Sequence, residues 1–153
     1  MGERFESVGA ALDFAIGNEV EAHAFYRELA ARTDVAAMRR VFEEFAAEEL
    51  GHKAKLEAVQ RGSRSVGAMN ERVQSLGLAD YLVESPPQAQ MTYAEALILA
   101  MKKEKAAYRL YLDLAAAVDA GELAELFRSL AAEEARHKLR FEIEYDDVVL
   151  KEN

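Results

Sequence analysis

Apolar residues recur along this chain at intervals of three and four positions, which is the spacing of residues that share one face of an α-helix. The pattern predicts four long helices, over about residues 7–32, 35–61, 92–119 and 122–150. Thr92 and Glu95 have the spacing of a capping box at the start of the third helix, and Gly62 and Gly121 mark helix ends. We therefore expect an all-α chain.

The lengths of the connections predict how these helices are arranged. Only a few residues separate the first helix from the second and the third from the fourth, so each pair should form an antiparallel hairpin. Residues 63–91 can run back along a helix of roughly 40 Å, and they include a candidate short helix around residues 69–76. We therefore expect residues 1–153 to form one domain, a four-helix bundle of two hairpins joined by one long crossover. This is the ferritin-like arrangement.

Composition limits the chemistry. The 153 residues carry a net charge of −9 with no basic stripe, so we do not expect nucleic-acid binding. There is no cysteine, which excludes disulfides, thiolate ligands and iron–sulfur clusters within this sequence. No secretion signal and no run of about 18 apolar residues is present, so we expect a cytoplasmic protein that does not enter membranes.

A repeated set of metal-ligating residue types is the most informative feature. A Glu-x-x-His motif occurs twice, beginning at Glu49 and again 85 positions later at Glu134. The same offset relates a Glu and a Tyr of the first helix to a Glu and a Tyr of the third. The repeated residues are Glu19, Tyr26, Glu49 and His52, and then Glu104, Tyr111, Glu134 and His137. A Glu and a His three positions apart share a helix face and can offer one oxygen and one nitrogen to a metal. Four Glu and two His from two equivalent halves are the ligand set of a two-metal site.

The residues around the repeated acids are apolar, mainly alanine, leucine and methionine. A carboxylate on such a face costs several kcal/mol unless it is paired or protonated. Two divalent cations would bring four positive charges against the four negative ones. We therefore predict that the four acids turn inward around two metal ions, and a metal-free bundle with hydrogen-bonded core acids is the alternative.

Together these motifs resemble the helical domain of rubrerythrins, within the ferritin-like diiron superfamily, over nearly the whole chain. The resemblance implies two iron ions per chain, with one terminal Glu and one His on each iron and two Glu bridging them. The expected terminal acids are Glu19 and Glu104, the expected histidine ligands are His52 and His137, and the expected bridging acids are Glu49 and Glu134. Oxygen-rich ligation with two nitrogens suits iron, manganese or a mixed pair and argues against structural zinc. The resemblance also implies that Tyr26 and Tyr111 hydrogen-bond the carboxylates.

The chain departs from the rubrerythrin pattern in two ways. Rubrerythrins proper carry a cysteine-rich rubredoxin domain, so here we expect electrons from a separate carrier such as a rubredoxin. Many rubrerythrins also have an additional ligand Glu one turn after the Glu of the third helix. That position is Ala107 and its repeat counterpart is Ala22, so the ligand set looks like the symmetric one of bacterioferritins.

Three further polar residues lie close to the motifs. His23 follows Glu19 by four positions, but its counterpart is Tyr108, so the repeat does not support His23 as a ligand. Glu48 and Glu133 precede the expected bridging acids and are rotated about 100° away from them on the helix. We expect these two acids on the helix surface or around the ligands.

The resemblance predicts an oxidoreductase that reduces hydrogen peroxide or O₂ at a diiron centre. Iron oxidation with storage, oxygenation of an organic substrate and a non-catalytic helical scaffold remain open as alternatives. The sequence also hints at a homodimer, because the face of the first helix opposite Glu19 has small residues where the third helix has basic ones. The pairs are Gly17 and Lys102, Val20 and Lys105, and Ala24 and Arg109.

Overall fold

The computed structural model describes residues 4–62, 72–83, 91–118 and 121–152. Its long helices are α1 (Val8–Arg32), α2 (Ala36–Gly62), α4 (Tyr93–Ala117) and α5 (Glu122–Glu152), and a short 3₁₀ helix, η1 (Leu78–Tyr81), precedes α4. Each long helix begins and ends within two residues of the position that the sequence predicts. The short helix expected around residues 69–76 lies partly outside the described residues, and residues 72–76 form hydrogen-bonded turns.

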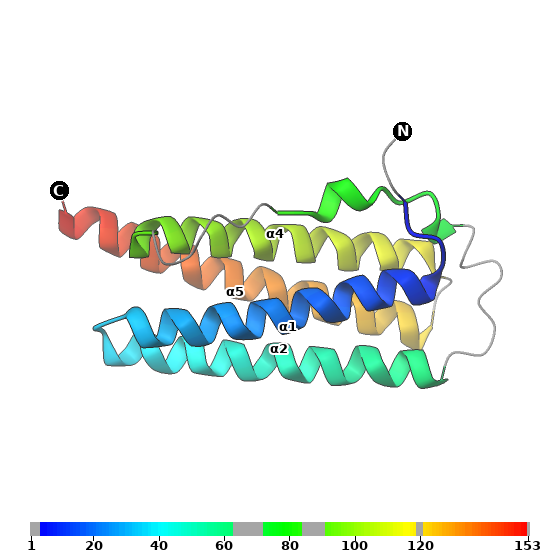
Figure 1. Ribbon diagram of the computed structural model, residues 1–153, viewed down its shortest axis with the longest axis horizontal. Coiled ribbons are helices and arrows are strands. Elements are labelled where there is room, and N and C mark those ends of the chain that lie inside the picture. The colour runs from blue at the N-terminus through cyan, green and yellow to red at the C-terminus, as the bar shows by residue number, and fades with distance from the viewer. Residues whose placement is uncertain (1–3, 63–71, 84–90, 119–120, 153) are drawn as a thin grey trace.

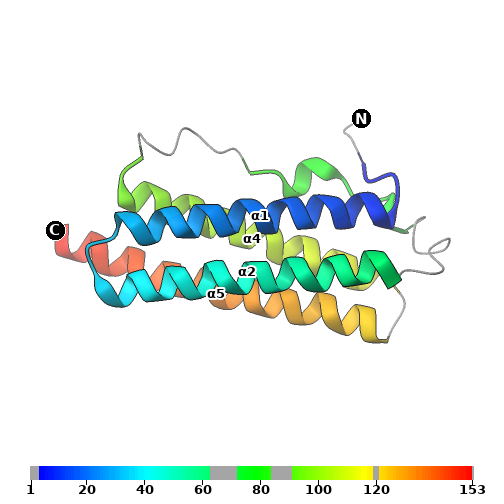
Figure 2. The ribbon, with the colours of Figure 1, turned by 60° about the horizontal axis from the view of Figure 1, so that its bottom comes forward.

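The helices form the predicted pair of antiparallel hairpins, α1 with α2 and α4 with α5 (Figure 1). α2 and α4 point in the same direction, as expected when a long crossover joins the hairpins (Figure 1). Across the bundle α1 lies beside α4, and hydrogen bonds link α2 to α5 (Figure 2). The ferritin-like four-helix bundle is thereby confirmed.

Local sequence signals account for the helix ends. The Ser7 hydroxyl accepts a 3.0 Å hydrogen bond from the backbone N–H of Ala10 and caps α1. The predicted capping box is present at α4, where Thr92 and Glu95 each accept a 3.0 Å bond from the other's backbone N–H. Gly121 has a φ of +121° directly before α5, a conformation that favours glycine.

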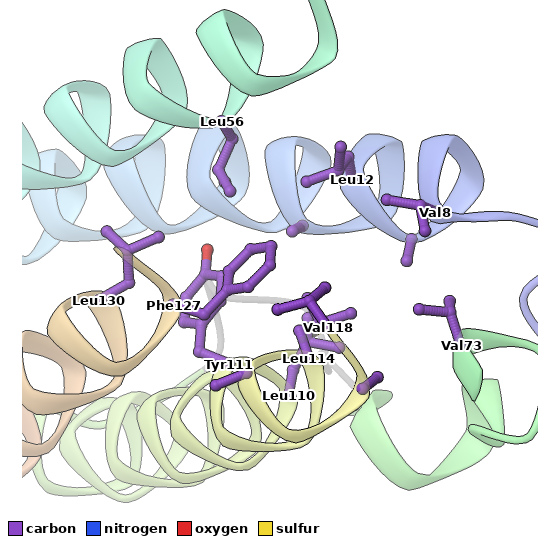
Figure 3. Packing of buried hydrophobic residues seen from close by; sticks show 14 of the residues in the cluster. Val8, Leu12, Leu56, Val73, Leu110, Tyr111, Leu114, Val118, Phe127 and Leu130 are labelled. Carbon is purple, nitrogen blue, oxygen red and sulfur yellow. The ribbon is translucent and has the colours of Figure 1, made fainter. Parts of the chain in front are cut away.

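Two apolar clusters fill the bundle, one toward each end. The first surrounds Leu12, Leu56 and Phe127 where α1 begins and α2 ends, and Figure 3 shows Tyr111 within it. The second surrounds Phe42, Leu97 and Phe141, where α1 ends and α2 begins, and includes Tyr26. Truncating a buried phenylalanine in such a core to alanine typically costs about 3–5 kcal/mol, so these clusters hold the hairpins together. They leave a polar layer between them.

None of the helices in the described part of the chain has a stretch long and apolar enough to cross a membrane.

Candidate metal centre

Six buried polar side chains occupy the layer between the two apolar clusters. They are the six ligands expected from the sequence: Glu19, Glu49, His52, Glu104, Glu134 and His137. None of them is more than 2 % exposed. Each of the four long helices contributes to the set, because the helical period turns every Glu-x-x-His pair and every lone Glu toward the bundle axis. The structure thus brings together all six residues.

The six side chains form two overlapping groups. One group contains Glu19 and His52, the other contains Glu104 and His137, and both groups contain Glu49 and Glu134. Within a group, one ligand atom from each residue lies within 4.8 Å of every other. This arrangement has two neighbouring cation positions that share two carboxylates, and each position has its own Glu and His.

One atom of every side chain in this layer is buried without a hydrogen-bond partner in the described structure. The six atoms are Glu19 Oε2, Glu49 Oε1, His52 Nδ1, Glu104 Oε2, Glu134 Oε1 and His137 Nδ1. A buried polar atom without a partner costs about 1–3 kcal/mol, and native structures contain few of them. Six such atoms facing one another are explained if they coordinate cations, so the residues fit a dinuclear metal site.

Both imidazoles are held by acids of the opposite hairpin. His52 Nε2 lies 2.8 Å from Glu133 Oε2, and His137 Nε2 lies 2.7 Å from Glu48 Oε2. A proton on Nε2 makes each imidazole a donor to its acid and leaves the Nδ1 lone pair facing the cluster. Glu48 and Glu133 therefore orient the histidines. The sequence predicted only that these two acids lie on the helix surface or around the ligands, although their recurrence at the 85-position offset could have indicated a shared role.

The two imidazoles differ electrostatically. Burial disfavours the charged form of His52, but its contacts with Glu134 and Glu19 prevail and raise its pKa. For His137 burial prevails, and its pKa is lowered. His137 also stacks on Phe45, with ring centroids 3.9 Å apart, whereas the repeat counterpart of Phe45 is the non-aromatic Leu130. The two halves are therefore similar but not identical.

Tyrosine hydroxyls reach the terminal carboxylates from the opposite hairpin. Tyr111 of α4 donates a 2.5 Å hydrogen bond to Glu19 Oε1 of α1. Tyr26 of α1 makes the reciprocal hydrogen bond to Glu104 Oε1 of α4. Each hydroxyl satisfies one oxygen of its acid and leaves the other for a metal. The expected role of the tyrosines matches this geometry.

The carboxylates are strongly perturbed because they are buried beside one another. Burial and repulsion from Glu134 raise the pKa of Glu19, and they raise the pKa of Glu49 and Glu104 well above the usual range. Burial also opposes ionisation of Glu134, but its close contacts with His52 and Glu49 outweigh burial and lower its pKa. The cluster therefore retains protons that bound cations would displace.

His23 lies outside the cluster. Its Nδ1 is 2.9 Å from the backbone carbonyl oxygen of Ala46, and it belongs to neither group of candidate ligands. The geometry agrees with the repeat, in which His23 has no histidine counterpart.

Comparisons with known proteins agree with this geometry. The model of the Rubrerythrin family matches residues 10–75 and 95–153. A Thermotoga maritima protein matches with a TM-score of 0.78, and the description of its crystal structure proposes that it is a ferritin-like diiron-carboxylate protein. It is 20 % identical, and the match covers 95 % of this chain and 98 % of that one. A hypothetical protein from Pyrococcus furiosus matches with a TM-score of 0.69 and 26 % identity, over 92 % of this chain and 89 % of that one. No curated protein matches the sequence.

Proposed function

Since this chain belongs to the rubrerythrin family, we propose that it is a non-haem diiron oxidoreductase that reduces hydrogen peroxide or O₂. The observation that carries the proposal is the set of six unpartnered buried atoms, one on each expected ligand. If this layer served only to stabilise the fold, apolar residues in it would give a more stable bundle. A layer of four acids and two imidazoles is advantageous when it binds metal.

The proposed ligands follow the two overlapping groups. Glu49 and Glu134, which belong to both groups, would be shared by two metals, and each metal would also be held by one further Glu and one histidine Nδ1. The donor set favours iron, and manganese or a mixed pair fits the same oxygen and nitrogen atoms. Two ferrous ions held there would supply the two electrons that, with two protons, convert one hydrogen peroxide to two waters.

The protein's own residues position the ligands and exclude solvent. Tyr26 and Tyr111 fix the two terminal acids through their hydroxyls. Burial raises the pKa of Tyr111 well above its usual value, so the hydroxyl keeps its proton and remains a donor to Glu19. The flanking apolar clusters keep bulk water from the two ends of the layer, and this strengthens the electrostatic contacts there.

The sequence holds no cysteine, so the electrons in this proposal come from a separate cytoplasmic carrier such as a rubredoxin. In this proposal the carrier docks on the side of α2 and α5, where the acids that hold the two histidines reach the surface. These acids, Glu48 and Glu133, are 34 % and 33 % exposed, whereas the ligands themselves are buried.

Anaerobic loading with Fe²⁺, followed by stopped-flow mixing with hydrogen peroxide and with O₂ in parallel, tests the proposal. We expect about two iron ions per chain, faster oxidation by peroxide than by O₂, and renewed activity when reduced rubredoxin is added. A Glu49→Ala, Glu134→Ala double variant is the matched control without bridging acids. Oxidation of excess Fe²⁺ by O₂ with mineral formation would instead indicate iron storage. Less than one metal per chain would indicate a scaffold.

A further inference from the structure

A cavity of about 300 Å³ lies against the metal centre between α1 and α4. Glu19, Glu49 and Glu134 form its floor. Tyr81 of η1 lies on the side away from that floor, together with the following residues Leu82 and Val83. The cavity thus connects the candidate ligands with the outer side of α1 and α4.

The cavity lies where the two repeated halves of the chain meet. Four pairs of counterparts at the 85-position offset line it together. They are Asn18 with Lys103, Glu21 with Ala106, Ala22 with Ala107, and Glu49 with Glu134. A molecule in the cavity would therefore face the two shared carboxylates and both cation positions. The opposite side of the centre is occupied by the two histidines and their acids.

The cavity is larger than hydrogen peroxide needs. Its volume corresponds to roughly ten waters of about 30 Å³ each and falls within the range of small-molecule sites. Ala22 and Ala107 make this space, because a larger residue at either position would fill it. Leu82 and Val83 add apolar surface. The walls therefore suit a short aliphatic chain.

Lys103 breaks the symmetry of the cavity, since its counterpart is the neutral Asn18. The Lys103 ammonium lies 5.6 Å from the centroid of the Phe25 ring. Glu21, also on the lining, attracts the ammonium, but Lys103 makes no ion pair within 4.0 Å among the described residues. With the four buried acids balanced by two divalent cations, this ammonium is available to a bound anion.

We propose that the cavity binds a short-chain aliphatic carboxylate, with its carboxylate held by Lys103 and its chain between Ala22 and Ala107. The protein then carries an organic-acid site directly beside its metal centre, in addition to the site of peroxide or O₂ reduction. This inference rests on the proposed metal centre, because without cations the acids of the floor would repel an anion.

Titration of the Co²⁺-loaded protein with acetate, propionate, butyrate and hexanoate tests this site. Co²⁺ avoids redox chemistry, and its visible spectrum reports changes beside the metals, while calorimetry gives the affinity. We expect the affinity to rise about fourfold per methylene until the cavity is full. The primary alcohol of each length should bind at least about tenfold more weakly, because it lacks the charge that pairs with the ammonium.

Variants distinguish binding of the carboxylate in the cavity from its direct coordination to the metal. Lys103→Met should weaken butyrate binding at least about tenfold, and Lys103→Arg should largely restore it. Ala107→Leu should abolish butyrate binding without changing the Co²⁺ content, because it fills the cavity and leaves the six ligands intact. Lys102→Met is the matched control, since Lys102 is exposed and lies outside the cavity lining.

The outcomes distinguish this inference from the proposed metal centre. Failure of the wild-type protein to bind Co²⁺ would refute the metal centre itself. Full Co²⁺ loading with butyrate binding that neither Lys103→Met nor Ala107→Leu alters would overturn only the organic-acid site. Equal affinity for butyrate and butanol would also overturn it, because Lys103 would then not anchor the ligand.

Discussion

The hydroxyl of Tyr111 donates a hydrogen bond of 2.5 Å to Oε1 of Glu19, which lies 92 positions earlier and on the other hairpin. Tyr26 and Glu104 make the reciprocal contact. Glu19 and Tyr26 share a face of α1, but seven residues of helix separate them by about 10 Å along the axis. The partner of each acid must therefore come from the opposite hairpin, and each hairpin positions a ligand of the other.

Removing one of these hydroxyls should weaken metal binding on one side of the centre. Tyr111→Phe leaves Oε1 of Glu19 without its donor, so we expect a loss of about 10–100-fold in affinity for one of the two metals. Competition with a chelator of known affinity measures this loss. Tyr108→Phe is the control, because Tyr108 is exposed on the same helix. Equal affinities in both variants would show that the hydroxyl does not support the ligand.

The overlap of the two candidate groups predicts how many metals each ligand variant retains. Glu49→Ala removes an acid common to both groups, so the protein should retain about zero metals after anaerobic loading and desalting. Glu19→Ala removes an acid from one group only and should leave about one metal. Elemental analysis gives the count, with the exposed Glu43→Ala as control. Two tightly bound metals in Glu49→Ala would refute the bridging role.

The acid behind each histidine should tune metal affinity. Glu133→Ala removes the partner of His52 Nε2, and we expect about 10–100-fold weaker binding of one metal. Glu133→Gln should lose less, because its carbonyl oxygen can still accept the imidazole proton. Isothermal titration with Co²⁺ measures both variants, and Glu57→Ala on the exposed part of α2 is the control. If the Ala and Gln variants are indistinguishable from wild type, the imidazole does not depend on this hydrogen bond.

Without metal, stability should fall as the pH rises, and Glu104 should contribute to the fall. Burial raises its pKa well above the ordinary value of a glutamate, so above about pH 4.5 the unfolded chain releases a proton that the folded protein keeps. Until the pH passes the folded pKa, such a group lowers the free energy of unfolding by about 1.4 kcal/mol per pH unit. Glu104→Gln should therefore gain stability relative to wild type as the pH rises above about 5, until the pH passes the raised pKa of Glu104 in the folded protein.

Urea denaturation of the metal-free proteins at several pH values measures this difference, with Glu43→Gln as the control for loss of an exposed charge. Parallel stability profiles for Glu104→Gln and wild type would mean that Glu104 ionises normally in the folded protein. Metal-loaded wild type should show the opposite trend, because cations displace the protons and bind more tightly as pH rises.

Much of this structure follows from short-range patterns. The helices were predictable because apolar spacing and capping residues are local signals. The six ligands were predictable because Glu49 and His52 recur in the second half of the chain at the same offset as Glu19. The partners of the ligands were not predictable in the same way. Which acid meets His137, and which tyrosine meets Glu19, depends on how α2 packs on α5 and α1 on α4, and one helix's periodicity does not specify that packing.

The homodimer expected from the sequence remains a proposal, and the outer face of the first hairpin gives it a clean test. Val20 and Leu50 are 44 % and 42 % exposed there, and a side chain added at Gly17 meets no atom within 4 Å. Gly17→Arg should therefore fold normally, keep its metals and become monomeric by light scattering. Lys102→Ala on the counterpart face should remain dimeric. A dimeric Gly17→Arg protein would exclude this face as the interface.

Joining the two hairpins in one chain has a consequence for how the cavity can evolve. In a symmetric assembly of two identical hairpins, every substitution would appear on both sides of the axis, so an amide on one side and an ammonium on the other could not arise. Within a single chain each side varies alone, and Asn18 opposite Lys103 is such a divergence. Selectivity can therefore change on one side while the shared carboxylates remain a matched pair.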